Sequence, residues 1–316
     1  MAKSDNPTKL VDLKTGYGCN NNCFFCAQAS NRYHGDKDSA TLKKEIKESR
    51  SQGCNKIVFT GGEVTIRPDI AELISYSSRI GFKDIQIQTN GRALYYKKLC
   101  KELVNAGANE FAVAIHGHIP QLHDYLTRSP GSFAQTTQGI RNLRELDQMV
   151  LTNTVIVKPN YRYAEQIARM LIGLDVDQYQ LAFVHPCSNA AKYFDKMVPF
   201  VSIAAPFIHK GLQVGIDAGI KVMAEAMPFC VMKGYEKYVS EFHIPPAQVR
   251  EYDFVVKDFE TTRKTELKVK FPQCKSCRYE LICEGPWKEY PEKRGNQEFR
   301  PVPGKKLTSQ KQVQKE

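Results

Sequence analysis

Residues 10–27 read LVDLKTGYGCNNNCFFCA and place three cysteines, Cys19, Cys23 and Cys26, directly after a β-rich run. Three thiolates on one short loop can hold three irons of a [4Fe–4S] cluster, which usually takes four cysteines, and so leave one iron open. The alternatives are a zinc site or cysteines buried in a core. Structural zinc normally has four ligands in close pairs, and this loop offers no paired fourth. The segment therefore favours a cluster with one open iron.

Strand-like apolar runs alternate with amphipathic helical segments through the first two-thirds of the chain. We predict strands at residues 10–15, 56–60, 84–89, 110–115, 151–157 and 178–184, and helices at 40–52, 69–80, 94–106, 133–147 and 161–172. Runs such as Ile57–Phe59 lack polar alternation, which suits a parallel sheet covered on both faces. Consecutive β/α units with right-handed crossovers predict an α/β fold, a partial (β/α)6 barrel of the TIM type.

The regular alternation is lost beyond about residue 200. We expect a helix from Phe200, a strand near 221–226, a polar helix and a hairpin over 252–270. The predicted parts are a barrel over residues 1–200, a small α+β domain over 201–300 and a disordered basic tail over 301–316. Lysines in the tail face only Glu316 as an opposite charge, which is typical of a solvated segment.

Composition narrows the classes of protein. The chain has 316 residues, of which 42% are hydrophobic and 25% charged, as in ordinary globular proteins. We see no apolar run long enough to span a bilayer and no secretory signal, so ten cysteines indicate metal binding in a reducing cytoplasm rather than disulfides. The net charge of +11 is compatible with an anionic substrate. Nucleic acid is not indicated, because no RNA-binding aromatic motif or dense Lys/Arg run is present.

Polar segments follow five of the six predicted strands, at the ends where barrel enzymes carry their chemistry. They are the cysteine loop, Gly61-Gly62-Glu63, Asn90-Gly91, His116-Gly117-His118 and His185-Pro186-Cys187. Glycines let a backbone approach a ligand closely, and a carboxylate accepts hydrogen bonds from an ammonium group. The arrangement predicts a ligand site over the strand ends.

The cysteine loop, with aromatic Phe25 before its last cysteine, resembles the cluster loop of the radical S-adenosylmethionine (radical SAM) superfamily. Residues 60–69 resemble its Gly-Gly-Glu motif, although Val64 stands where most members have proline, and residues 88–91 resemble its strand-three ending. The resemblance implies that S-adenosylmethionine (SAM) chelates the open iron. It also implies an enzyme, an oxidoreductase or a bond-forming type, with a reduced flavodoxin- or ferredoxin-type electron donor. Such an enzyme cleaves SAM to a 5′-deoxyadenosyl radical that abstracts hydrogen from a substrate C–H bond.

The same resemblance assigns residues to the SAM site. It implies that Gly61, Gly62 and Glu63 contact the methionyl amino group, that Asn90 and Gly91 form part of the wall, and that Asn153 and Val155, or Ile156, contact ribose and adenine. His116 lies where related enzymes touch ribose or substrate. It could shuttle a proton, or it could be structural.

A second cysteine group, Cys274, Cys277 and Cys283, has C-x₂-C-x₅-C spacing. This spacing resembles the auxiliary-cluster domains named SPASM and twitch. Position 287 is Trp where SPASM domains have another cysteine, so the single-cluster twitch form is the better match. The resemblance implies a second [4Fe–4S] cluster with one upstream cysteine as its fourth ligand. Cys230, which ends a predicted strand and opens a loop, is the preferred choice, and Cys187 is the competitor. Zinc is the alternative for these thiolates.

The assignment of the fourth ligand has a consequence for Cys187. If Cys230 is the ligand, Cys187 is free above the barrel mouth and either donates a hydrogen atom or stays inert. The remaining cysteines, Cys54 and Cys100, are expected in the core.

The substrate stays open at this stage. Relatives with such auxiliary domains modify peptides, protein side chains or small metabolites, and a nucleotide or RNA is a further alternative. A hypothesis of another class is a non-catalytic two-cluster electron carrier or a zinc-binding interaction module. Gly62-Glu63 and Asn90-Gly91 argue against it, because a carrier has no need of a SAM pocket.

Overall fold

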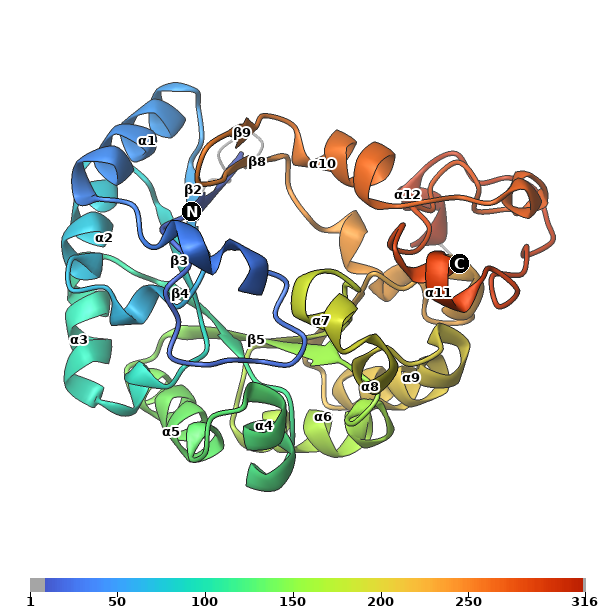
Figure 1. Cartoon of the computed structure of the whole chain (residues 1–316), viewed down its shortest axis with the longest axis horizontal. Coiled ribbons are helices and arrows are strands. Elements are labelled where there is room, and N and C mark those ends of the chain that lie inside the picture. The colour runs from blue at the N-terminus through green and yellow to red at the C-terminus, as the bar shows by residue number, and fades with distance from the viewer. Residues whose placement is uncertain (1–8, 315–316) are drawn as a thin grey trace.

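The fold is built on one curved nine-stranded sheet (Figure 1). The structure, a computed structural model, describes residues 9–314, so most of the N-terminal segment inspected for a secretory signal lies outside it. The strands are β1 Leu10–Lys14, β2 Lys56–Thr60, β3 Asp84–Thr89, β4 Glu110–Ala114, β5 Met149–Ile156, β6 Gln178–Phe183, β7 Lys221–Glu225, β8 Ala247–Arg250 and β9 Val255–Val256. Their spatial order is β7-β6-β5-β4-β3-β2-β1-β8-β9, and only β9 is antiparallel to its neighbour. The sheet is open, which confirms the predicted partial barrel.

Helices cover the outer face of the sheet (Figure 1). The longer ones are α1 Ser39–Ser51, α2 Ile70–Arg79, α3 Lys97–Ala106, α4 Pro120–Thr127, α5 Ser132–Arg144, α6 Ala164–Gly173 and α9 Val201–Asp217. The shorter ones are α7 Ser188–Lys192, α8 Phe194–Met197, α10 Phe259–Thr262, α11 Tyr290–Arg294 and α12 Gln310–Val313.

The sequence explains where these elements begin, end and pack. The Asp38 carboxylate caps α1 by accepting from the Thr41 N–H at 2.8 Å, and Gly107, with φ of 117°, ends α3 in a left-handed conformation. Leu13 and Phe59 are fully buried in the main core. Burial of each such side chain stabilises the fold by about 1.5–3 kcal/mol.

The region beyond residue 200 contributes to both edges of the sheet. Strand β7 pairs with β6, and β8 pairs with β1 in parallel. The sheet therefore continues past the predicted boundary at residue 200. The expected hairpin over 252–270 is wrong, since the antiparallel pair is β8 with β9 and residues 259–267 are helical. The expected polar helix is replaced by short 3-10 turns at Glu236–Tyr238 and Ser240–Phe242.

The basic tail is packed rather than disordered over residues 301–314. The Leu307 N–H donates to the Arg278 carbonyl at 2.8 Å, and Leu307 and Val313 are buried. Apolar contacts of two side chains thus override a composition typical of a solvated segment. Lys315 and Glu316 lie outside the described residues. Across residues 9–314, no helix is both long and apolar enough to cross a membrane.

Candidate functional site

The three cysteines of the first group lie on the loop that joins β1 to α1, at the carboxyl ends of the strands. Burial raises the pKa of the Cys23 thiol, and the nearby Cys26 and Cys19 raise it further. Burial is also the main cause of the raised pKa of Cys19, and the nearby Cys26 raises that pKa further. The thiols are therefore close enough to repel one another when ionised. A bound cationic metal centre would stabilise three such thiolates.

The predicted Gly-Gly-Glu segment packs directly on the cysteine loop. The Gly62 N–H donates to the Gly16 carbonyl and the Glu63 N–H to the Gly18 carbonyl, both at 2.7 Å. A Cβ added at Gly62 would lie 2.1 Å from the Gly18 oxygen, and one at Gly61 would lie 2.2 Å from the Gly16 oxygen. Only glycine permits this contact between the two loops.

The Glu63 carboxylate is bound within the chain. The residue is 3% exposed. Its Oε1 accepts from the Thr65 N–H at 3.1 Å, from the Thr65 hydroxyl and from the Thr89 hydroxyl at 2.6 Å. Its Oε2 accepts from the Asn90 N–H at 2.6 Å. A carboxylate has about four acceptor positions, so these donors occupy most of them. Glu63 therefore joins the loop after β2 to the end of β3.

Asn90 connects the end of β3 to the cysteine loop. Its Nδ2 donates to Asn20 Oδ1 at 2.7 Å and lies 3.9 Å from Cys19 Sγ. A Cβ added to the next residue, Gly91, would lie 2.8 Å from a Val113 methyl group, so this turn also requires glycine. The structure thus brings together Glu63, Asn90 and the cysteine loop, which lie far apart in the sequence.

Two arginines at this loop were missed by the sequence reasoning. Arg92 donates to the Asn20 carbonyl and, at 3.0 Å, to Asn21 Oδ1. Arg32 donates to the Asn21 carbonyl at 2.7 Å, and its charge partly opposes the rise in the pKa of Cys19 and Cys23. Only the position of Arg92 directly after Asn90-Gly91 could have indicated it. Both arginines therefore hold the loop, and Arg32 also favours the anionic form of the two thiols.

His116 is buried at the end of β4, with 4% of its surface exposed. Its Nδ1 accepts from the Val155 N–H at 3.2 Å, and its ring meets Phe25 edge to face at 4.6 Å. Burial, with a further effect of His123, lowers the pKa of His116 well below its usual value, so the ring is neutral. These contacts join β4, β5 and the cysteine loop, and they favour the structural role that the sequence left open. Asn153 is nearby on β5, and its buried Oδ1 has no hydrogen-bond partner.

Cys187 lines a cavity of about 410 Å³ at the barrel mouth, which we call the mouth cavity. Ala27 and Gln28, next to Cys26, line it as well. Burial and the neighbouring Glu289 raise the pKa of Cys187 to about 11. The preceding His185 stacks on Trp287 at 3.9 Å, and its Nε2 lies 3.2 Å from the Glu289 carboxylate. Cys187 therefore faces the space beside the first cysteine group.

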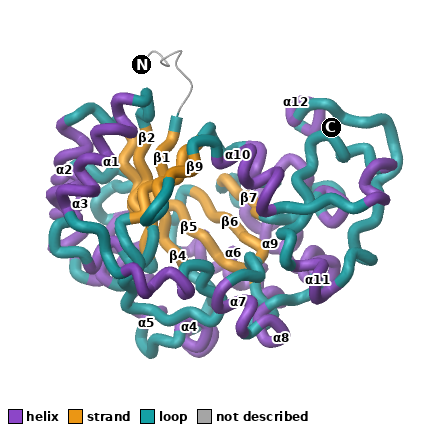
Figure 2. Tube along the Cα trace, turned by 45° about the horizontal axis from the view of Figure 1, so that its top comes forward, coloured by secondary structure: helices purple, strands orange, loops and turns teal. Residues whose placement is uncertain are grey.

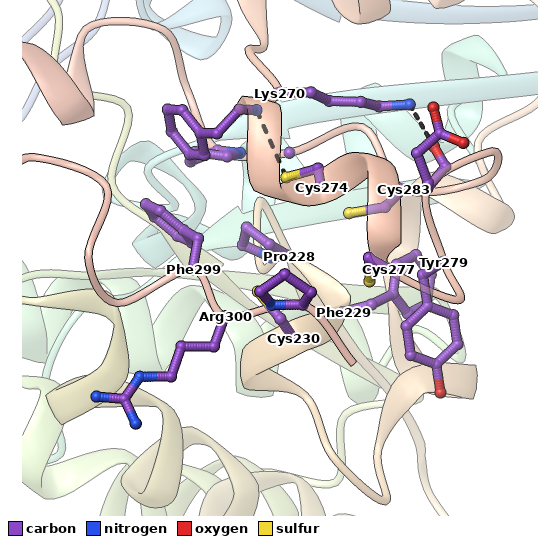
Figure 3. A pocket seen from close by; sticks show the side chains of 15 residues that line it. Pro228, Phe229, Cys230, Lys270, Cys274, Cys277, Tyr279, Cys283, Phe299 and Arg300 are labelled. Atoms are coloured by element: carbon purple, nitrogen blue, oxygen red, sulfur yellow. Dashed lines mark hydrogen bonds between the residues drawn. The ribbon is translucent and has the colours of Figure 1, made fainter. Parts of the chain in front are cut away.

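The second cysteine group surrounds a different, smaller cavity of about 30 Å³ (Figure 3). Cys230, Cys274, Cys277 and Cys283 all line it, and Cys187 does not. Phe229, Phe271 and Phe299 are among its apolar walls. Burial raises the pKa of Cys230 to about 12, and the thiols of Cys283, Cys277 and Cys274 add to the effect. Cys230 reaches this group because it lies on the short turn that follows β7.

The number and kind of ligand atoms in each cysteine group indicate which metal centre it could bind. The described residues contain no three His, Cys, Asp or Glu side chains placed to hold a single metal ion. Thiolates are the ligands that iron–sulfur clusters take, and the four thiols around one mostly apolar cavity in the second group fit such a cluster. The second group offers four thiols and the first offers three.

The chain matches the model of a known family and is similar to several curated proteins. The model of the family described as Radical SAM superfamily matches residues 13–171, half of the chain. The chain is similar to an AdoMet-dependent heme synthase of Methanosarcina barkeri, with 29% identity over 188 residues, 59% of this chain and 53% of that protein. It is also similar to a GTP 3',8-cyclase of Aquifex aeolicus, with 30% identity over 164 residues, 50% of this chain and 51% of that protein. The chain thus spans about half the length of these curated relatives.

Solved structures share the fold at low sequence identity. SuiB of Streptococcus suis bound to S-adenosylmethionine aligns with a TM-score of 0.65 and 15% identity over 94% of this chain and 76% of that chain. Native anSMEcpe with bound AdoMet and Cp18Cys peptide aligns with a TM-score of 0.55 and 17% identity over 69% of this chain and 63% of that chain. The match of the family model, together with the enzymes among the relatives, confirms the resemblance drawn from the cysteine loop: the chain belongs to the radical SAM superfamily and is an enzyme.

Proposed function

We propose that the chain is a two-cluster radical SAM enzyme. In this proposal Cys19, Cys23 and Cys26 hold the SAM-binding [4Fe–4S] cluster. Cys230, Cys274, Cys277 and Cys283 hold an auxiliary [4Fe–4S] cluster. The observation that carries the proposal is the cavity that these four thiols line, separate from the loop with three. When bound, the first cluster and SAM supply a 5′-deoxyadenosyl radical that abstracts hydrogen from a substrate C–H bond.

The choice of Cys230 over Cys187 sets the role of the auxiliary cluster. Four cysteines complete the ligand shell of a [4Fe–4S] cluster and leave no iron open to substrate. Since Cys230 lines the small cavity of the second cysteine group and Cys187 lines the mouth cavity, we assign the auxiliary cluster to electron transfer. This assignment leaves Cys187 in the mouth cavity, available as a hydrogen donor.

The residues of the chain prepare the SAM site. Glu63 holds the Asn90 backbone, and Asn90 and Arg92 hold the cysteine loop. We therefore assign Gly62 and Asn90 to contact with SAM and Glu63 mainly to positioning Asn90. Asn153, whose buried Oδ1 lacks a partner, remains our candidate for a contact with the nucleoside part of SAM.

The names of the similar proteins point to two classes of substrate, peptides and small molecules. SuiB has been crystallised with its precursor peptide SuiA, and anSMEcpe with a Cp18Cys peptide. The heme synthase and the GTP 3',8-cyclase are named for small molecules. We propose a peptide side chain or a small metabolite as the substrate of this chain.

Anaerobic reconstitution tests the proposal. The wild-type chain should bind about eight irons, four for each cluster, and the Cys19/Cys23/Cys26→Ala variant about four. With SAM and dithionite, only the wild type should form 5′-deoxyadenosine. Cys230→Ser should destabilise the auxiliary cluster, whereas the matched variant Cys187→Ser should retain it. About four irons in the wild type, or loss of the auxiliary cluster in Cys187→Ser, would contradict the assignment.

A further inference from the structure

A second large cavity, of about 340 Å³, lies inside the curve of the sheet, and we call it the interior cavity. The layer of strands is curved (Figure 2), and residues from each of β1 to β7 line the cavity. Side chains two residues apart on a strand point to the same face, and such pairs line the cavity. They include Gln86 and Gln88, Leu151 and Asn153, Gln178 and Gln180, and Met223 and Glu225. Asp12 lines both this cavity and the mouth cavity, so the two adjoin.

Five carboxamide side chains line the interior cavity among apolar residues, and the cavity carries three acidic or basic groups besides His243. These are Asp12, Lys56 and Glu225. Lys56 is paired with Glu110, and Asp12 with Lys14 at 3.0 Å, so both charges are balanced. Glu225 differs from them. Its Oε2 accepts from Gln180 Nε2, and within residues 9–314 no cationic nitrogen forms an ion pair with it.

The charged groups behind Glu225 do not supply the missing cation. They are Glu241 and Lys268, which lie 3.5 Å apart, and Arg263 and Glu284, which lie 2.7 Å apart. Each cation thus already has a carboxylate partner. Burial and the nearby Glu241 raise the pKa of Glu225 to about 7, although Lys268 and Arg263 oppose the shift. The cavity therefore presents one carboxyl group that lacks a counter-ion.

We propose that the interior cavity binds the substrate through a primary ammonium group held by the Glu225 carboxylate. An ammonium supplies the missing positive charge and three N–H donors. The carboxamide of Gln88 would bind another polar atom of the same molecule. The volume of about 340 Å³ is at the lower end for a small-molecule site, which suits a small amine or a single lysine side chain.

This inference rests on the proposed function only in taking the bound ligand to be the substrate. The net charge of +11 suggested an anionic substrate, whereas this proposal is for a cationic one. The basic residues that give that net charge do not determine the charge inside the barrel. There the unbalanced group is an acid.

Isothermal titration calorimetry on the reconstituted full chain tests the proposal without turnover. The probes are Nα-acetyl-lysine amide and 1,5-diaminopentane, with Nα-acetyl-norleucine amide as the neutral control. At about pH 8 we expect at least one amine to bind tenfold or more tightly than the norleucine probe. Tighter binding of the lysine amide would indicate a peptide substrate, and tighter binding of the diamine a free metabolite.

The pH dependence and one variant identify the group responsible. Since the pKa of Glu225 is about 7, its ionised fraction, and with it the affinity, should fall about tenfold between pH 8 and pH 6. Glu225→Gln should abolish both the preference for the amine and its pH dependence. The matched variant Asp253→Asn, in the mouth cavity, should keep both. Equal affinity for lysine and norleucine probes, binding of none of them, or a retained preference in Glu225→Gln would overturn the proposal. Formation of 5′-deoxyadenosine tests the proposed function separately.

Discussion

Glu63→Gln should destabilise the fold and weaken SAM binding together. The carboxylate accepts four hydrogen bonds at a position that is 3% exposed. Glutamine keeps only one acceptor oxygen. If that oxygen continues to accept from Thr65 and Thr89, the NH₂ group of the glutamine faces the Asn90 N–H. One charge-assisted bond is lost and two donors are left facing each other, which costs about 2–4 kcal/mol. With a urea m-value of about 3 kcal/mol/M, the unfolding midpoint should fall by about 1 M.

Urea unfolding followed by circular dichroism measures the change in stability, and equilibrium dialysis of SAM against the anaerobically reconstituted protein measures binding. Glu72→Gln is the matched control, because Glu72 lies on the surface of α2 with a side chain that is 58% exposed. We expect it to change the unfolding free energy by no more than about 0.5 kcal/mol. A Glu63→Gln variant with the stability and SAM affinity of the wild type would refute the role of the carboxylate in positioning Asn90.

Three further changes follow from the same structure. Gly62→Ala places a Cβ 2.1 Å from the Gly18 oxygen, so it should displace the cysteine loop and reduce bound iron from about eight to about four per chain in an iron assay. Arg32→Gln removes a cation beside Cys19 and Cys23, so redox titration followed by EPR should give a more negative potential for that cluster, and an unchanged potential would contradict this. The raised pKa of Glu225 means that the folded state binds its proton more tightly than the unfolded state. Wild-type stability should therefore fall by about 2 kcal/mol relative to Glu225→Gln as pH rises from about 5 to 8, and parallel urea midpoints would contradict it.

The barrel was predictable because its strands are continuous apolar runs and several helices end at glycine. The six strands predicted for residues 10–184 lie within two residues of the observed bounds. Strand β8 was missed because it is short and its polar residues are buried by distant partners. Arg250 donates to the Ser49 hydroxyl at 2.7 Å and to Glu48 at 2.8 Å. A local pattern of hydrophobicity cannot show such contacts.

Some features of the candidate site could likewise be predicted from the sequence, and others could not. The spacing of the cysteines and the Gly-Gly-Glu segment are local signals. The two cysteine groups and the segment after β2 could therefore be identified as candidate site residues from the sequence. The arginines at the cysteine loop, the carboxylate contacts of Glu63 and the unbalanced charge of Glu225 depend on residues brought together by folding. These features had no local signal to indicate their role, except that Arg92 follows Asn90-Gly91 directly.

EPR of the dithionite-reduced protein, with and without SAM, tests most directly whether the three-cysteine loop holds a cluster with an open iron. Comparing the wild type with Cys230→Ser and with Cys19/Cys23/Cys26→Ala separates the two clusters. We predict that SAM changes the cluster spectrum of the wild type and of Cys230→Ser, and leaves the spectrum of the triple variant unchanged. A wild-type spectrum that does not respond to SAM, or a response that survives in the triple variant, would contradict the central claim.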